Sequence, residues 1–392
     1  MEHENERYMI RVLCFVCDAP ARAFVKGISL YNSYNGCEYC RCKGQYVGGK
    51  VVFPKLDRLR TDASFSQFME NNQHTLSPIC QIPHFNSVTS TPPEYMHSVC
   101  LGIMRKLLLL WTCSKVSISS SAYRLSPSLR RALNEKCVYF GKQLPCEFKR
   151  KIRSVEEIKR WKATELRSFL LYVGPVVLKN ILSTDHYHHF ILLHFSITVL
   201  ASDSLQDWHP HAFQCLRLFV EGMESLYGLE NVVYNVHCLL HLEDSVKPFG
   251  SLHIFSAFPF ENALFSLKQR IRSSNCTLKQ IFNRIIELED NITTNLPVYT
   301  EIRNPGEIFR TVCGKIILCH ELNGNICSGS VLLPSCVNNS LYEYPYSSQL
   351  LGIGVYEKTG SLSNGVVSEK LIHFSRDSKY FTIFPFISKL LN

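Results

Sequence analysis

Two pairs of potential metal ligands, far apart in the chain, constrain its fold more than any other feature of the sequence. Cys37 and Cys40 are separated by two residues, the gap that lets both thiolates bind one tetrahedral zinc ion. His237 and His241 follow roughly two hundred residues later, and their i, i+4 spacing places both imidazoles on one face of a helix. If the four side chains share one Zn²⁺, the intervening chain must leave this place and return to it.

Two acidic residues bracket these pairs. Asp18 follows an apolar run, residues 8–16, that predicts a largely buried strand, and Glu261 begins a stretch with helical character. A zinc ion that closes the long excursion between the ligand pairs would hold the two carboxylates near each other. This arrangement indicates a nuclease-like site for two metal ions on a zinc-stabilised scaffold.

Each of these residues also has a simpler structural interpretation. The cysteines are alternatively a pair of buried thiols, and Cys42 lies close enough to compete for a ligand position. The histidines are alternatively hydrogen-bonded core residues on a helix face. Asp18 fits the N-cap of the helix that follows it. Glu261 fits the first turn of a helix, where the helix dipole favours an acidic residue.

Length and composition bound the fold class without choosing a function. The 392 residues, 46% of them hydrophobic, suffice for a large core in two or more domains. The formal net charge of +9 allows phosphate binding without requiring it. The first residues do not resemble a secretory signal, so we interpret the 17 cysteines as reduced thiols and metal ligands. We expect no membrane span, because no run of 18 apolar residues occurs.

The spacing of apolar residues predicts helices over most of the chain and strands near its end. A helix is expected from Asp18 to about Leu30, and another from the Pro92-Pro93 pair to about Trp111. Further helices are predicted at 155–171, 187–200, 210–227, 232–246 and 262–291, so that residues 125–245 form an all-helical region. After Pro305 short β-rich runs are predicted at 311–320, 352–356, 365–374 and 380–384.

Six short motifs, in a specific order, resemble those of CACTA (En/Spm-type) DDE transposases. They are Cys17-Asp18-Ala19-Pro20-Ala21-Arg22, Gly36-Cys37-Glu38-Tyr39-Cys40, Tyr95-Met96-His97-Ser98-Val99-Cys100-Leu101-Gly102, Trp161-Lys162-Ala163-Thr164-Glu165, Asn235-Val236-His237 through Phe249-Gly250, and Phe258-Pro259-Phe260-Glu261-Asn262. The resemblance covers roughly residues 8 to 290. That superfamily is related to the hAT elements and the V(D)J recombinase catalytic subunit, which share a ribonuclease-H-like core interrupted by a helical insertion domain.

The resemblance implies a mixed fold, α/β plus α, in four segments. Residues 1–90 are expected to form a partial ribonuclease-H-like core that carries Asp18 and the C-x2-C pair. Residues 91–230 are expected to form the helical insertion domain. Residues 231–300 then return to the core with the H-x3-H pair and the helix of Glu261, and residues 301–392 form a β-rich C-terminal appendix.

The same resemblance assigns roles to the candidate site residues. It makes Asp18 the second catalytic carboxylate and Glu261 the third, with Mg²⁺ as the ancestral catalytic metal. It makes Cys37, Cys40, His237 and His241 the ligands of a structural Zn²⁺. The steps from Asp18 to Cys37 and from His241 to Glu261, 19 and 20 residues, are similar to those of the recombinase.

DNA is the partner that the resemblance implies. Trp161 lies in the family's insertion domain, where an aromatic ring can stack on a flipped base; its alternative role is that of a core residue. Lys268, Arg270 and Arg272 follow Glu261, where a DNA backbone passes in the family, and are candidate phosphate contacts. Their alternative role is that of a solvated helix face.

The sequence departs from the family at its beginning. The family carries its first catalytic Asp well upstream of the second, and only 17 residues precede Asp18 here. We therefore expect the first Asp and the first three core strands to be missing, Mg²⁺ binding to be weak, and strand transfer to be lost.

These expectations lead to one functional hypothesis and two alternatives. The hypothesis is a transposase-derived nuclear fragment with DNA-binding and strand-transfer ancestry but without catalytic activity. One alternative is a domesticated nuclear module that binds DNA or protein. The other is a live transposase whose upstream part is encoded in a neighbouring reading frame. Each is compatible with a homo-oligomer.

Overall fold

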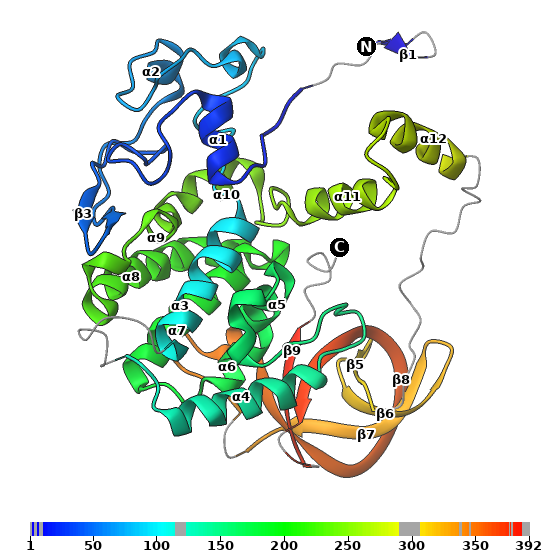
Figure 1. Cartoon of the computed structure of the whole chain (residues 1–392). Coiled ribbons are helices and arrows are strands. Elements are labelled where there is room, and N and C mark those ends of the chain that lie inside the picture. The colour runs from blue at the N-terminus through cyan, green and yellow to red at the C-terminus, as the bar shows by residue number, and fades with distance from the viewer. Residues whose placement is uncertain are drawn as a thin grey trace. The chain divides into compact units, whose positions relative to one another are not determined.

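The computed structural model describes residues 2–3, 6–7, 11–113, 123–289, 306–336, 339–344, 346–375, 377 and 379–385. The chain divides into two units. The first comprises Met1–Ser256, Pro334–Tyr356 and Ile372–Leu391, and the second comprises Ala257–Leu333 and Glu357–Leu371. Helices predominate in the first unit, whereas strands predominate in the sequence after residue 306 (Figure 1). The predicted mixture of α and β structure is therefore confirmed at this level.

The N-terminal segment, residues 11–90, contains few regular elements. Short strands β1 (Glu2–His3) and β2 (Glu6–Arg7) precede it and pair with each other. Its elements are α1 (Ala19–Lys26), β3 (Gln45–Val47), β4 (Lys50–Val52), α2 (Asp62–Ser66) and the 3-10 helix η1 (Pro78–Gln81).

The strand predicted at residues 8–16 is wrong for its described part, residues 11–16; residues 8–10 lie outside the description. Residues 11–16 have no regular secondary structure. Val12 and Leu13 are 38% and 54% exposed. Phe15 donates its backbone N–H to Ser90 O at 2.9 Å, a single bond that does not make a ladder. An apolar run becomes a strand only beside another strand, and none is described next to this one.

Strands β3 and β4 form a hairpin that joins the N-terminal segment to the helices. Gly48 and Gly49, at its tip, have φ values of +57° and +80°, which a tight two-residue hairpin turn favours and glycine adopts without strain. Beyond β4, Phe53 donates its N–H to Val232 O at 2.9 Å. Adjacent glycines are a hairpin signal in the sequence, but the hairpin was not among the predicted elements.

The helical body, described at residues 96–113 and 123–249, confirms the predicted all-helical region. Its elements are the π-helix η2 (Met96–Met104), α3 (Arg105–Thr112), α4 (Pro127–Lys142), η4 (Val155–Arg160), α5 (Ala163–Ser168), the π-helix η5 (Phe169–Val173), α6 (Gly174–Val177), α7 (Thr184–Leu200), η6 (Asp203–Trp208), α8 (His209–Tyr227), η7 (Leu229–Asn231), α9 (Tyr234–His237), η8 (Cys238–His241) and α10 (Leu242–Phe249). The helix predicted at 155–171 is interrupted at Trp161 and Lys162.

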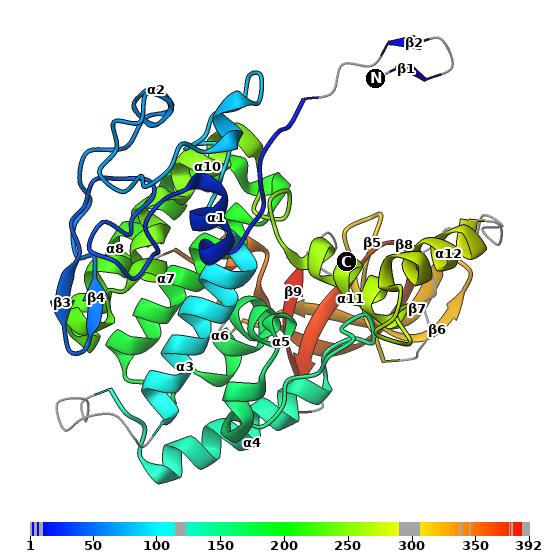
Figure 2. The same cartoon turned by 45° about the horizontal axis from the view of Figure 1, so that its top comes forward.

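Helix α7 lies at the centre of this body. Apolar residues occur on all its sides and are buried from Phe190 to Leu200, as expected of a helix surrounded by other helices. It packs along α8 in both views (Figures 1 and 2). Trp111 at the end of α3 donates its indole N–H to the Tyr227 hydroxyl at 3.2 Å. This hydrogen bond links α3 to the C-terminal end of α8.

The last part of the chain is β-rich, as predicted from about residue 305. Its elements are β5 (Ile308–Thr311), β6 (Ile316–Asn323), β7 (Ile326–Pro334), the 3-10 helix η9 (Ser348–Leu351), β8 (Gly354–Ser375) and β9 (Tyr380–Pro385). The strands form one sheet in the order β5-β6-β7-β8-β9, and β5 also pairs with β8. The pairings of β5 with β6, β6 with β7 and β5 with β8 are antiparallel.

One predicted helix is two helices in the structure. In place of a continuous helix at 262–291, α11 (Phe258–Gln269) and α12 (Thr277–Glu289) are separated by residues 270–276. Cys276, directly before α12, has a φ of +49°, a left-handed conformation incompatible with a continuing helix. Residues 290 and 291 lie outside the description.

The predicted partial ribonuclease-H-like core is not confirmed. Across the described parts of residues 1–90 and 231–300, where that core was expected, the only sheets are the two-stranded β1–β2 and β3–β4 pairs. The described helices include none with the length and hydropathy required to cross a membrane.

A buried acid connects α1 to the beginning of α9. The Glu38 carboxylate accepts hydrogen bonds from Arg22 Nε at 2.8 Å, Lys26 Nζ at 3.2 Å and the Tyr234 hydroxyl at 2.6 Å. Burial alone would raise the pKa of Glu38, but Arg22 and Lys26 outweigh it and lower this pKa to about 2. The carboxylate is therefore ionised, and it compensates two buried cations.

We expect Glu38→Gln to lower the free energy of unfolding by about 3–5 kcal/mol, because it leaves two buried cations without their counter-charge. Chemical denaturation at pH 7 measures this change. The control is Glu243→Gln, since Glu243 pairs with Arg217 and Lys247, which are 58% and 66% exposed. Its effect should stay below about 1 kcal/mol. Equal effects of the two substitutions would contradict the prediction.

The pH dependence has a defined sign. The pKa of Glu38 in the folded chain lies below its ordinary value of 4.5, so its stabilisation is fully present above pH 4.5. It is lost as the pH falls from there toward about 2. The Gln variant lacks this part of the acid sensitivity.

Candidate metal centre

The two ligand pairs predicted from the sequence meet in the structure. Cys37 Sγ lies 3.5 Å from Cys40 Sγ and 3.5 Å from His241 Nε2. Cys40 Sγ lies 3.3 Å from His237 Nε2, and the two Nε2 atoms are 3.2 Å apart. None of the four residues is more than 1% exposed. We call this group the Cys2His2 cluster.

These separations fit the edges of a zinc tetrahedron. Bonds of about 2.3 Å to sulfur and 2.0 Å to nitrogen imply edges of about 3.8 Å between sulfurs, 3.5 Å between sulfur and nitrogen, and 3.3 Å between nitrogens. Each measured edge agrees to within about 0.3 Å. The cluster can therefore hold a metal ion such as zinc, as the spacing of the four residues predicts.

A tight turn presents the two cysteines. The backbone N–H of Cys40 points at Cys37 Sγ, with N and S 3.4 Å apart, which stabilises negative charge on that sulfur. Gly36 precedes the turn where any side chain would collide with the backbone, because a Cβ there would lie 2.6 Å from Tyr31 O. Arg60 also stabilises the turn, because its Nε–H donates a hydrogen bond to Cys37 O at 3.1 Å.

Two consecutive helical turns, α9 and η8, present the histidines. His237 Nδ1 lies 3.1 Å from Phe53 O, directly after the hairpin. A proton on Nδ1 donates to this carbonyl and leaves the Nε2 lone pair directed at the thiolates, the usual arrangement behind a metal-bound imidazole. Burial lowers the pKa of His241, so its imidazole is neutral at pH 7, as a metal ligand must be.

The cysteines differ in their electrostatics. Burial raises the pKa of Cys37 well above its ordinary value, whereas the hydrogen bond between the two thiol groups lowers that of Cys40. Because a zinc ion binds both as thiolates, its binding must displace the Cys37 proton. Cys42, the competing cysteine, lies outside the group of four ligands.

Asp18 acts as the N-cap of α1, which was its alternative role. Its Oδ1 accepts the backbone N–H of Ala21 at 2.8 Å. Glu261 is exposed in the first turn of α11, also in agreement with its alternative. Asp18 belongs to the first unit and Glu261 to the second, so their predicted proximity stays a prediction.

The predicted DNA-binding residues fall into two groups. Trp161 is 1% exposed, and its indole N–H donates to Ser154 O at 3.0 Å. This buried ring leaves no face on which a base could stack, so the structure favours its alternative role in the core. Lys268 and Arg272 are exposed and Arg270 is half-buried, which leaves their phosphate contacts as a prediction.

The sequence analysis did not identify the buried charged residues that stabilise the segment around the Cys pair. Glu38 lies between the two cysteines, and its partners Arg22 and Lys26 are spaced i, i+4 on α1. A second buried acid, Glu70, accepts a hydrogen bond from Arg60 Nη1 at 2.5 Å. An acid inside a C-x2-C turn and two cations at helical spacing were visible in the sequence, but only the fold brings them together.

Comparisons of the chain with protein-family models, with curated proteins and with solved structures find no match. The resemblance to CACTA transposases therefore stays a prediction from the motifs. The function must be argued from the site itself.

We expect the purified chain to contain one zinc ion, and Cys40→Ser and His237→Ala to abolish its retention. Elemental analysis and native mass spectrometry of protein prepared without chelators measure the stoichiometry. Cys42→Ser is the matched control, because it removes a neighbouring buried cysteine outside the cluster and should leave the zinc content unchanged. Full retention in both ligand variants would exclude zinc at this cluster.

Removal of the metal should loosen the N-terminal segment before the helical body. After treatment with a chelator we expect faster amide hydrogen exchange in residues 37–60 and continued protection in α7, because α7 has a hydrophobic core of its own. The Cys40→Ser variant should show the same pattern without chelator. Simultaneous loss of protection in α7 would contradict this local effect.

Proposed function

We propose that this chain is a zinc-containing DNA-binding protein of DDE transposase descent that does not cleave DNA by itself. The observation that carries the proposal is the Cys2His2 cluster. Its pairs lie 197 residues apart, from Cys40 to His237, and the motif resemblance requires them to meet across that interval.

The chemistry of the cluster supports a structural zinc ion. Four protein ligands complete the tetrahedral coordination, and all four are buried. A catalytic zinc needs an open position for water or substrate, and this ligand set leaves none. The metal would therefore hold the N-terminal segment against α9 and η8 and take no part in hydrolysis.

The placement of acidic residues supports the absence of cleavage. Two-metal phosphoryl transfer needs several carboxylates around a pair of divalent ions. In the described part of the chain, the only group of three or more Cys, His, Asp or Glu side chains within reach of one ion is the Cys2His2 cluster, which contains no carboxylate. Asp18, the catalytic candidate nearest to this cluster in sequence, is engaged as a helix cap.

The charge of the chain supports DNA as the partner. The formal net charge is +9, and Lys268 and Arg272 carry exposed positive charges just after the predicted catalytic helix position. Cations of this kind bind the phosphate backbone without reading the sequence. The proposed binding is therefore electrostatic, with nuclear DNA as the natural polyanion.

We expect DNA affinity that falls linearly on a plot of log affinity against log salt concentration. Replacing Lys268, Arg270 and Arg272 together with alanine should reduce the magnitude of the slope by up to about 3, one for each lost phosphate contact. Fluorescence anisotropy with a duplex at several salt concentrations measures it. The control replaces Lys142, Lys149 and Arg150, three exposed cations of the other unit, and should change the slope less. Equal slopes for both variants would remove the α11 region from the interface.

The purified chain should not nick or join DNA in Mg²⁺ or Mn²⁺, as measured with a supercoiled plasmid. The informative variant is Asp18→Asn, because asparagine preserves the helix cap while it removes the carboxylate charge. Cleavage by the natural chain that disappears in Asp18→Asn would show an active site, and the proposal of inactivity would fail. Cleavage that persists in the variant would indicate a contaminating nuclease.

A further inference from the structure

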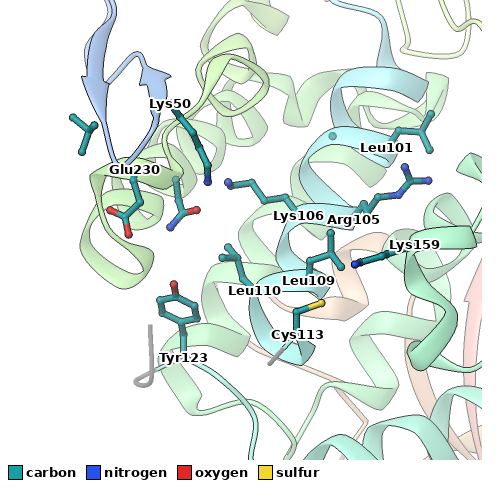
Figure 3. Close-up of a pocket in the computed structure, with 14 residues that line it drawn as sticks. Lys50, Leu101, Arg105, Lys106, Leu109, Leu110, Cys113, Tyr123, Lys159 and Glu230 are labelled. Carbon is teal, nitrogen blue, oxygen red and sulfur yellow. The ribbon is translucent and has the colours of Figure 1, made fainter. Parts of the chain in front are cut away.

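A basic cavity of about 700 Å³ lies in the first unit, between the β3–β4 hairpin and α3. Figure 3 shows four cationic residues around it: Lys50 from the hairpin, Arg105 and Lys106 from α3, and Lys159 from η4. Glu230 is the one acidic residue of the lining. These residues come from separate parts of the chain, so the fold gathers charge that the sequence does not display as a cluster.

The four cations of this cavity outnumber its one acidic residue. Lys50, Lys106 and Lys159 make no ion pair with any described residue, although Glu230 exerts an attraction on Lys106. Arg105 donates one hydrogen bond, from Nη2 to Trp161 O at 2.7 Å, and its buried Nε has no partner among the described residues. The three lysines therefore have no ion pair to break when an anion binds.

The proximity of these cations is electrostatically unfavourable. Burial and the neighbouring Lys50 lower the pKa of Lys106 to about 8, and the attraction of Glu230 does not compensate. In Figure 3 the side chains of Lys50 and Lys106 point toward each other across the cavity. A bound anion between them would remove this repulsion and restore full protonation of Lys106.

The remaining lining indicates which kind of anion fits. Leu101, Leu109 and Leu110 form an apolar wall, and Tyr123 adds an aromatic ring. The volume lies in the range of pockets that bind organic ligands and far exceeds that of a lone phosphate ion. Several cations from different elements match a multiply charged group better than a single carboxylate.

We propose that this cavity binds a phosphate-bearing nucleotide, with its phosphates between Lys50 and Lys106 and its base against the apolar wall. The nucleotide is either free or a unit of a nucleic-acid strand, and both sources present the same chemistry. This binding is separate from the proposed DNA contact of α11 and does not rest on it.

Isothermal titration calorimetry of the full zinc-containing chain tests the proposal with two probes, ATP and a ten-nucleotide oligothymidylate. Lys50→Met and Lys106→Met remove the charge and keep most of the side-chain volume, and each should weaken binding at least tenfold. Lys142→Met, which removes an exposed cation outside the lining, should leave the affinity within twofold. The alanine variant of Lys268, Arg270 and Arg272 should leave the ATP affinity unchanged, which separates this test from that of DNA binding.

The outcomes decide both the proposal and the source of the phosphate. Binding of ATP that both Met variants weaken supports a free nucleotide. Binding of the oligonucleotide alone, weakened by the same variants, supports a strand. Absence of binding by both probes, or affinities unchanged in both variants, would overturn the proposal. The melting temperature of Lys106→Met should match that of the natural chain, because Lys106 forms no ion pair that the substitution would break. If Lys106→Met melts at a lower temperature, the affinity of the Lys50→Met variant decides the test, because Lys50 is exposed and its replacement should not affect folding.

Discussion

The convergence of two cysteines and two histidines, 197 residues apart at their nearest, is the constraint on which the first unit depends. The N-terminal segment has few helices and strands of its own, and its apolar core is small. That core includes both cysteine ligands and Phe53, and it packs against Tyr234 and Cys238, which are close to the histidines in sequence. A segment with so few regular elements would gain much of its order from a metal bound at these ligands.

Buried ion pairs also stabilise the N-terminal segment around the cysteines. Glu38, between the cysteines, is compensated from α1, and Glu70 is compensated by Arg41 and Arg60. Burial raises the pKa of Glu70, but its hydrogen bonds with Arg41, Ser64 and Arg60 and the Arg60 charge lower it below the ordinary value. Arg60 also binds the carbonyl of Cys37, so that one side chain links a buried acid to a metal ligand. Polar networks of this kind specify one arrangement, because a lost partner leaves a buried charge.

The sequence predicted those features that depend on local spacing. The structure confirms the Cys37–Cys40 pair and the His237–His241 pair, each of which lies within a few consecutive residues. It also confirms the helical character of residues 125–245, where the periodicity arises within individual helices. The sequence-based prediction failed where contacts with other parts of the chain determine the structure. Residues 11–16 are apolar but have no described strand beside them, and the ring of Trp161 is buried instead of being exposed to a base. The basic cavity has no signal in the sequence for the same reason, because its four cations come from three elements.

The long interval between the ligand pairs costs less chain entropy than metal coordination at the cluster would offset. Closing a loop of 197 residues costs about 5 kcal/mol in chain entropy, whereas a structural zinc site contributes about 10–16 kcal/mol near neutral pH. The closure cost grows only with the logarithm of loop length, so a doubled interval would add about 0.6 kcal/mol. The cluster therefore fixes where the intervening chain begins and ends and places little restriction on its content. The helical body between the pairs can build its own core around α7, and a separate binding cavity beside α3, without disturbing the metal ligands.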